Sequence, residues 1–452
     1  MHLFGARGLS LAYDVHSGSL HALDEAATAV LREWTFRGGP PPAGTTAAPS
    51  DSLDPRIIAG RELQELVSRG ELFAAPAAAP REVADLGVRA LCLHLAHDCN
   101  LSCRYCFAAS GALKGPRSLM SLEVARAGVD FLLRSSRGYP YLAVDFFGGE
   151  PTLDWDVLVG TVDYARRRGA EEGRQFRFTV TTNAYALNGD MVSFLARNMD
   201  NIVLSLDGRP EVHDRMRKAR GTPTHAQCLA NAKRMVEALQ PYRSERGPGH
   251  YIRGTFTAAN LDFHHDVEYL LDEGFTEISM EPVVLSGGPL ALTADHLEEI
   301  GRSYEELAQL YVRRHREGRP FTFYHFEMDD HSGPCLEKRL TGCGAGYQYL
   351  ALTPEGDLFP CHQFVGRPPY LMGSLNGEGP SAGLSMAFRR NHAGNKAACR
   401  ACWARYLCGG GCHANADQFH GSLDKPYELG CQLSRLRWEW ALWARAAWSL
   451  GL

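Results

Sequence analysis

Residues 99–106 have the sequence CNLSCRYC and place three cysteines, Cys99, Cys103 and Cys106, within eight positions. The apolar stretch 91–97 before them is typical of a buried strand, so we expect the three thiols in the loop that leaves the strand's carboxyl end. Three thiolates are one short of the four that close a four-iron cluster. Zinc is the alternative, although zinc sites more often take four ligands from two closely spaced Cys pairs.

The chain then alternates between apolar strands and helical patterns. Six strands separated by helices predict an α/β fold with a parallel sheet, whose ligands bind at the carboxyl ends of the strands. The strands expected after 91–97 are 141–149, 176–184, 201–208, 251–260 and 275–283, and helices are expected near 122–135, 155–168, 226–239 and 263–273.

Short motifs end several of these strands. GGEP occupies 148–151, Thr-Asn occupies 182–183 and SLDG occupies 205–208, with His-Asp at 213–214 and an arginine three residues later. Each motif alone is weak evidence for a function, but all of them follow the cysteine triplet in order along the chain. Together they resemble the radical S-adenosylmethionine (SAM) family over residues 88–284.

This resemblance implies a partial (β/α)6 TIM-type barrel over 88–310, with a bridging segment at 311–334. It also implies a four-iron cluster on the three cysteines, whose open iron chelates SAM. Tyr105 would lie beside the adenine, and Arg217 would pair with the SAM carboxylate. The other SAM contacts implied are Gly148, Gly149, Glu150, Pro151, Thr182, Asn183, Ser205 and Asp207.

A second group of cysteines fills the last quarter of the chain. By spacing alone, Cys399-x2-Cys402-x5-Cys408-x3-Cys412-x18-Cys431 is compatible with a zinc ribbon. Behind a radical SAM core, however, residues 335–434 resemble a SPASM domain, which holds two auxiliary [4Fe-4S] clusters and brings the total to three. The family pattern assigns the inner cluster to Cys335, Cys343, Cys361 and Cys412, and the outer cluster to Cys399, Cys402, Cys408 and Cys431.

The first 80 residues form a separate unit with two linkers. Residues 9–24 predict two short strands joined by a turn at 16–18, and helical patterns follow at 26–34 and 58–70. Pro, Gly and Ala dominate the linkers at 38–52 and 75–80. The unit resembles a winged helix-like recognition domain for ribosomally made precursor peptides, which captures a leader peptide as an added strand.

The segments 13–25, 338–366 and 399–416 are similar to those of the maturases of six-Cys-in-forty-five peptides and of the quinohemoprotein amine dehydrogenase maturation enzyme. Both families join a cysteine sulfur to a carbon of another residue. The resemblance implies a Cys-containing precursor peptide, a ferredoxin- or flavodoxin-type reductant, and a base among His362, Asp214 and Glu281. Sulfatase maturases are an alternative, but they carry Asp where this chain has His362. A non-enzymatic electron carrier is another alternative, and it would form no 5′-deoxyadenosine.

Composition and charge limit which partners, metal chemistry and location the chain can have. The chain has 452 residues, a net charge of −5 and a pI near 6.4, which argues against nucleic acid as a partner. Thirteen cysteines favour metal ligation over disulfides in a chain expected to be soluble and cytoplasmic. We expect no contact with a membrane, because the Trp-rich end 435–452 carries arginines and predicts an amphipathic helix. Cys92 and Cys228 stand alone and are expected to be buried structural thiols.

Overall fold

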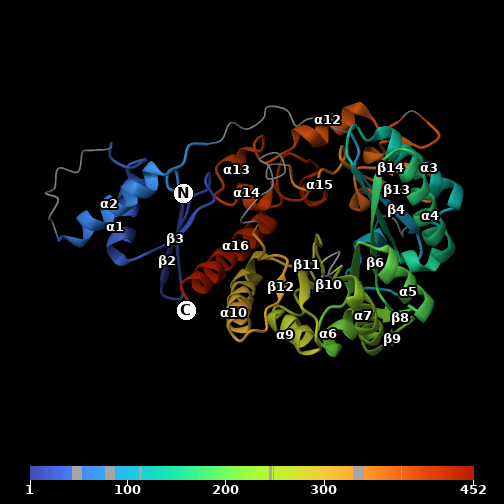
Figure 1. Cartoon of the computed structure of the whole chain (residues 1–452), viewed down its shortest axis with the longest axis horizontal. Helices are drawn as coiled ribbons and strands as arrows, with labels where there is room; N and C mark the ends of the chain where they lie inside the picture. Colours follow the sequence, from blue (N-terminus) through green and yellow to red (C-terminus); the bar gives the residue numbers. More distant parts are fainter. Residues whose placement is uncertain are drawn as a thin grey trace.

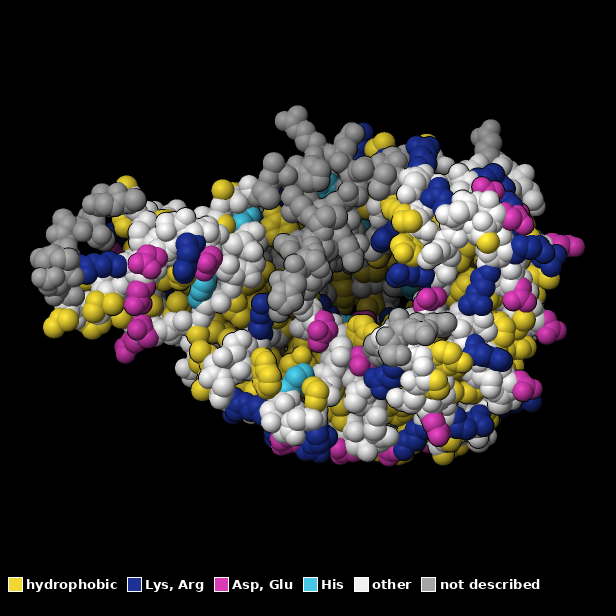
Figure 2. All heavy atoms as spheres, in the orientation of Figure 1, with side chains coloured by type: hydrophobic (Ala, Val, Ile, Leu, Met, Phe, Trp, Pro, Cys, Tyr) yellow, Lys and Arg dark blue, Asp and Glu magenta, His cyan; other side chains and the backbone are white. Residues whose placement is uncertain are grey.

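In the computed structural model, the chain forms one large sheet flanked by helices, with a smaller N-terminal unit beside it (Figure 1). The structure describes residues 1–42, 53–76, 87–110, 115–243, 247, 249–328, 341–377 and 379–452. Most of the predicted linker residues, and Cys335, lie outside these ranges. No helix of the described chain is long and apolar enough to cross a membrane. Basic and acidic side chains are interspersed over the described part of the face in Figure 2.

The six predicted strands lie side by side in chain order, and each is parallel to its neighbours. This arrangement confirms the predicted α/β class with a parallel sheet. Because all carboxyl ends point the same way, the predicted site motifs meet at one edge of the sheet. The strands are β4 (Ala90–Ala96), β5 (Tyr141–Gly148), β6 (Gln175–Thr182), β7 (Asn201–Ser205), β10 (His250–Phe256) and β11 (Glu277–Pro282).

Helices connect these strands and cover one face of the sheet. Alternate strand residues such as Leu91, Leu93 and Leu95 are fully buried in the main core with the helices. The residues between them, such as Cys92 and His94, therefore face the opposite side of the sheet. The helices are α3 (Leu122–Ser135), α4 (Trp155–Glu171), α5 (Gly189–Asn198), α6 (Pro210–Met216), α7 (His225–Leu239), α9 (His264–Asp272) and α10 (Leu297–Arg316), and a hairpin of β8 (Lys218–Ala219) and β9 (Thr222–Pro223) precedes α7.

The sheet continues beyond the predicted strands. The strand β12 (Thr322–Phe323) extends the β11 edge, and β13 (Tyr349–Leu352) pairs parallel to β4. Two short strands, β14 (Asp357–Phe359) and β15 (Gly373–Ser374), follow β13 in antiparallel order. The sequence analysis predicted no strand in this region. It did not predict β13, because its four residues are too few to show the alternating pattern of a strand.

Short helices and one long helix complete the Cys-rich region. The long helix, α16 (Glu428–Ser449), begins seven residues before the predicted helix at 435–452. It packs along α10 and places Leu433, Trp438 and Trp443 in the main core. The short helices are α12 (Ala382–Arg390), α13 (Ala397–Arg400), α14 (Arg405–Cys408) and α15 (His413–His420).

The N-terminal unit is a three-stranded antiparallel sheet with two helices. The strands β2 (Leu9–Tyr13) and β3 (Leu20–Leu23) and the turn at 16–18 match the prediction, whereas β1 (His2–Ala6) was missed. Asp14 fixes the turn, because its Oδ1 accepts hydrogen bonds from the backbone of His16 and Ser17, both at 2.9 Å. The helices are α1 (Glu25–Phe36) and α2 (Pro55–Ser68).

Candidate active site and metal centres

The loop with the first three cysteines leaves β4 and rests on the segment that follows α6. Ser102 N donates to the Lys218 carbonyl at 2.7 Å, and Arg104 N donates to the Met216 carbonyl at 3.0 Å. Burial raises the pKa of Cys99 to about 12 and that of Cys103 to about 11. Metal binding at these thiols would therefore have to displace protons.

The three cysteines of the first loop lie close to one another. Within the described residues, no three His, Cys, Asp or Glu side chains gather closely enough to hold one metal ion. Thiolates that bind different iron atoms of a cluster need not converge on one point. Cys99 nevertheless interacts electrostatically with both Cys103 and Cys106, so the three thiols share one small volume.

Gly148 and Gly149 bring the end of β5 against the start of the cysteine loop. Gly149 N donates to the Ala96 carbonyl at 2.7 Å. A Cβ at Gly149 would lie 2.1 Å from the Asp98 carbonyl oxygen, and one at Gly148 would lie 2.4 Å from that of Ala96. Only glycine permits this approach. The glycine edge therefore holds the cysteine loop at the carboxyl end of the sheet.

Glu150 ties two neighbouring strand ends together. Its side chain is 1% exposed and accepts hydrogen bonds from Thr152 Oγ1 at 2.6 Å, Thr182 Oγ1 at 2.8 Å and Asn183 N at 2.8 Å. Burial raises the pKa of Glu150, although these hydrogen bonds oppose the shift. Asn183 continues the link, because its Nδ2 lies 2.7 Å from Asn100 Oδ1 and 3.8 Å from Cys99 Sγ.

Tyr105, Asp207 and Arg217 form a triad in which Asp207 and Arg217 are buried and Tyr105 is partly buried. The Tyr105 hydroxyl donates to Asp207 at 2.6 Å, and Arg217 donates to the same carboxylate through Nε at 3.0 Å and Nη2 at 3.1 Å. The Arg217 guanidinium also lies 5.4 Å from the centre of the Tyr105 ring. Sequence reasoning placed all three residues at the site but missed that they bind each other. The pairing of Arg217 with a SAM carboxylate remains a prediction.

The remaining predicted contacts lie at the same edge with fewer interactions. Pro151 is buried and begins a 3-10 turn (Pro151–Asp154) before α4. Ser205 is the last residue of β7 and is half-buried. Both therefore flank the triad and the glycine edge without a hydrogen bond that fixes a role.

The three candidate bases have different surroundings. Asp214 Oδ1 accepts hydrogen bonds from Thr224 N at 2.7 Å and from His225 N at 2.8 Å. These bonds hold its carboxylate at the start of α7. Glu281, at the end of β11, is 36% exposed and lies 3.6 Å from His325 Nε2 and 3.9 Å from Arg253 Nη2. Burial would raise the pKa of Glu281, but the charges around it outweigh burial and lower the pKa.

His325, which sequence reasoning missed, has its tautomer set by Arg437. A guanidinium can only donate, so the Arg437 Nη1 contact at 3.1 Å makes His325 Nδ1 the acceptor. The proton of the neutral ring therefore lies on Nε2, which is 3.0 Å from Ser279 Oγ and faces Glu281. Burial lowers the pKa of His325 to about 4, so the ring is neutral near pH 7, and Arg253 and Arg437 supply the positive charge near Glu281 at that pH.

His362 lies between the first cysteine loop and the Cys-rich region. Its ring centroid is 5.4 Å from that of Phe107, which follows Cys106, and 4.9 Å from that of Phe147 on β5. Burial lowers the pKa of His362 to about 4. Its Nδ1 and both ring nitrogens of the neighbouring His94 are buried, with no hydrogen-bond partner among the described residues. Within the described part of the chain, these imidazole nitrogens thus lie between the two cysteine regions without a hydrogen-bond partner.

The inner group of cysteines is partly described. Cys361 interacts electrostatically with Cys343 and Cys412, and burial raises its pKa. The predicted fourth ligand, Cys335, lies outside the described residues. The structure therefore brings three of the four predicted inner thiols together and leaves the fourth assignment a prediction.

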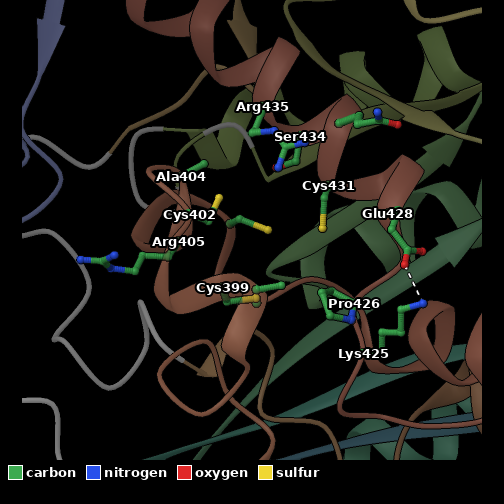
Figure 3. A pocket seen from close by; sticks show the side chains of 14 residues that line it. Cys399, Cys402, Ala404, Arg405, Lys425, Pro426, Glu428, Cys431, Ser434 and Arg435 are labelled. Atoms are coloured by element: carbon green, nitrogen blue, oxygen red, sulfur yellow. Dashed lines mark ion pairs between the residues drawn. The ribbon is translucent and has the colours of Figure 1, made fainter. Parts of the chain in front are cut away.

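The outer group is complete. Cys399, Cys402, Cys408 and Cys431 line one cavity of about 320 Å³ between the α13–α14 segment and the start of α16 (Figure 3). Burial raises the pKa of Cys431 to about 11, and the other three thiols add to the shift. Four thiol donors around one cavity fit a closed four-iron cluster.

Lys396 is a residue that sequence reasoning missed. It is 3% exposed, its Nζ donates to the Gly410 carbonyl at 3.1 Å, and it interacts electrostatically with the outer thiols Cys399 and Cys408 and the inner thiol Cys412. A buried cation requires nearby negative charge. Thiolates of both predicted clusters would supply that charge. Its position three residues before Cys399 was the available signal.

Comparisons with known proteins agree with this arrangement. Residues 93–242 match the model of the radical SAM superfamily. The mycofactocin maturase MftC of Mycolicibacterium smegmatis is 28% identical over 74% of this chain and 81% of that protein. A cysteine-type anaerobic sulfatase-maturating enzyme of Clostridium perfringens is 29% identical over 32% of this chain and 39% of its own length. The chain spans 63% of the uncharacterized protein MJ0907 of Methanocaldococcus jannaschii, with 26% identity over 43% of this chain.

Among solved structures, native anSMEcpe with bound AdoMet and the Cp18Cys peptide is similar. The TM-score is 0.63 at 18% identity, and the match covers 80% of this chain and 99% of that chain. At this identity the likeness concerns the fold alone. It confirms the predicted fold class.

Proposed function

Because this chain carries a radical SAM domain, we propose that it is a peptide maturase that joins a cysteine sulfur to a carbon of another residue in a precursor peptide. The observation that carries the proposal is the three-cysteine loop pressed against the Gly148–Gly149 edge at the carboxyl end of the sheet. The similarity to a mycofactocin maturase supports a peptide substrate. The thioether product rests on the family resemblance of the segments 13–25, 338–366 and 399–416.

The radical SAM domain implies SAM and one [4Fe-4S] cluster, and Cys99, Cys103 and Cys106 are the ligands that we propose for it. When SAM and the cluster are both bound, they would supply a 5′-deoxyadenosyl radical that removes a hydrogen atom from the substrate. The residues of the chain orient and shield this chemistry. Glu150 and Asn183 hold the loop to two strand ends, and the Tyr105 ring is fixed by Asp207.

We propose that the Cys-rich region binds two auxiliary [4Fe-4S] clusters that carry the surplus electron away from the product. The shared cavity of the four outer thiols supports the outer cluster. The electrostatic contacts of Cys361 with Cys343 and Cys412 support the inner cluster, with Cys335 as the fourth ligand. A ferredoxin- or flavodoxin-type protein is the proposed reductant.

The N-terminal unit is the proposed leader-binding domain. Within the described residues its sheet has three strands, so β1 and β3 each have an edge that an extended peptide could join. His2 of β1 stacks on Trp403 with ring centroids 3.9 Å apart, which holds the unit beside the Cys-rich region. A leader peptide bound here would therefore lie near the Cys-rich region.

Glu281 is the proposed acceptor of the substrate thiol proton. Asp214 is occupied at the start of α7, and His362 packs between Phe107 and Phe147. Glu281 instead combines partial exposure at a strand end with a lowered pKa, so it is ionised near neutral pH. An ionised carboxylate can take a proton when a thiol is brought into hydrogen-bond reach.

The test is anaerobic incubation of the reconstituted enzyme with SAM, a reductant and a Cys-containing precursor, followed by mass spectrometry. We expect 5′-deoxyadenosine and a peptide that is lighter by two hydrogen atoms and resists thiol alkylation. A peptide that loses one sulfur and two hydrogen atoms and gains one oxygen, as in oxidation of cysteine to formylglycine, would favour the sulfatase-maturase alternative, for which a Clostridium perfringens relative is the specific support. Absence of deoxyadenosine from a fully clustered enzyme would overturn the proposal.

Two cysteine variants sharpen this test. Cys103→Ala removes a proposed ligand and is expected to abolish deoxyadenosine formation. Cys228→Ala is the matched control, because Cys228 is fully buried in the main core among helix residues and is assigned to no cluster. Equal loss of deoxyadenosine in both variants would contradict the proposed ligand set.

A further inference from the structure

The outer cysteine site lies in a basic segment of an acidic protein. Residues 379–435 contain seven Lys and Arg but only three Asp and Glu, a net charge of +4, whereas the rest of the chain carries −9. All four outer thiols fall within this segment. The field near the outer site is therefore positive although the molecule as a whole is negative.

Several of these cations surround the cavity. Arg405, Lys425 and Arg435 line it (Figure 3). Arg390, nine residues before Cys399, and Arg400, directly after it, are both exposed. Asn395 ties them together, because its Nδ2 donates to the Arg390 carbonyl at 2.7 Å and its carbonyl accepts from Arg400 Nη1 at 3.3 Å.

The acidic residues of the segment do not cancel this charge. Glu428 pairs with Lys425 at 2.9 Å, and Asp417 pairs with Arg367, from outside the segment, at 2.8 Å. Arg405 meets the neutral partner His16 of the N-terminal unit, with Nη2 3.0 Å from the ring nitrogen. The four arginines 390, 400, 405 and 435 therefore form what we term the basic flank.

We propose that the basic flank is the docking surface for a small acidic electron-carrier protein that exchanges one electron with the outer cluster. This inference rests on the proposed function of the four outer thiols. In turnover the reduced cluster loses one electron and the oxidised carrier gains it, and no bond forms or breaks. Transfer from a reduced carrier to the oxidised cluster is the reverse of this step and uses the same docking surface. Charge complementarity identifies the partner, because opposite charges speed the association of small, short-lived electron-transfer complexes.

The experiment is stopped-flow reduction of the reconstituted full chain by reduced flavodoxin, a carrier of net negative charge. The test variant is Arg390→Glu with Arg400→Glu, since neither side chain lines the cavity. The matched control is Arg126→Glu with Arg134→Glu, two exposed arginines on α3, which lies apart from α13 (Figure 1). Both variants change the net charge equally. A photoreduced neutral deazaflavin serves as a second reductant that needs no docking.

We expect the flavodoxin rate of the test variant to fall by about tenfold or more at low salt, because steering by charge changes association rates by this order. The difference from wild type is expected to shrink near 1 M salt, where the screening length is about 3 Å. The deazaflavin rate is expected to stay unchanged. A fall of equal size in the control variant, or no fall in the test variant, would overturn the proposal.

Cluster content separates this inference from its premise. Iron analysis and electron paramagnetic resonance of each protein before mixing report whether the outer cluster is present. A wild-type protein without it would overturn the proposed function of the four thiols and the docking site together. Should the Glu variant lose the cluster, Arg390→Gln with Arg400→Gln removes the charges without reversing them, and a smaller but salt-sensitive fall is expected.

Discussion

The parallel sheet and the Cys-rich region are stabilised by different means. The strands β4 to β11 bury apolar side chains such as Leu93, Val144 and Ile252 completely beneath the helix layer. In the Cys-rich region, α13 and α14 have four residues each, and the left-handed glycines 409–411 follow. Helices this short have little stability of their own. The first region can form from apolar burial alone, whereas the second depends on its proposed metal ligation.

Removal of iron tests this difference most strongly. Without ligation, we expect hydrogen exchange of the α13–α15 amides to rise by about 10³-fold, equivalent to about 4 kcal/mol of local stability. The amides of β4 to β7 are expected to change little, because the core beneath them holds no proposed ligand. Exchange mass spectrometry of the iron-free and reconstituted proteins measures both regions at once. Equal loss of protection in the two regions would contradict the comparison.

Asp207→Asn tests whether the sheet edge has its own polar support. Asp207 is 0% exposed and is the ion-pair partner of the buried Arg217. Loss of its charge leaves a buried guanidinium uncompensated, so we expect the free energy of unfolding to fall by about 3 kcal/mol. Urea unfolding measures the change. Asp163→Asn, at an exposed position of α4, is the control and is expected to change stability by under about 0.5 kcal/mol.

The sequence predicted the parallel sheet more completely than it predicted the Cys-rich region. In the sheet, alternating apolar residues located β5 and β6, and the helix predicted at 122–135 matches α3. The Asp207–Arg217 pair was missed, because a motif names residues but not their partners. In the Cys-rich region, the family resemblance grouped the four outer thiols, which line one cavity. Spacing did not predict β13 or the burial of Lys396, since both depend on contacts with distant parts of the chain.

Gly149→Ala tests the contact that joins the sheet to the cysteine loop. The added Cβ would lie 2.1 Å from the Asp98 carbonyl oxygen, a backbone atom that can move only with the loop. We expect a loss of about 2 kcal/mol of stability together with weaker SAM binding. Gly189→Ala is the control, because open space surrounds a Cβ there. Thermal unfolding and calorimetric titration with SAM measure the two effects, and equal behaviour of both variants would refute the role of Gly149.

Lys396→Met produces the smallest effect and probes the link between the two proposed auxiliary clusters. The buried ammonium interacts with Cys399 and Cys408 of the outer group and with Cys412 of the inner group. A positive charge favours the reduced, more negative cluster, so its removal is expected to lower the reduction potentials by about 60 mV, or about 1.4 kcal/mol for one electron. Lys396→Arg keeps the charge and is expected to restore most of the potential. Lys425→Met is the exposed counterpart at the same cavity, where solvent screening reduces the expected shift to a small fraction. Redox titration followed by electron paramagnetic resonance measures all three variants, and equal shifts for the buried and the exposed lysine would show that burial does not strengthen the interaction.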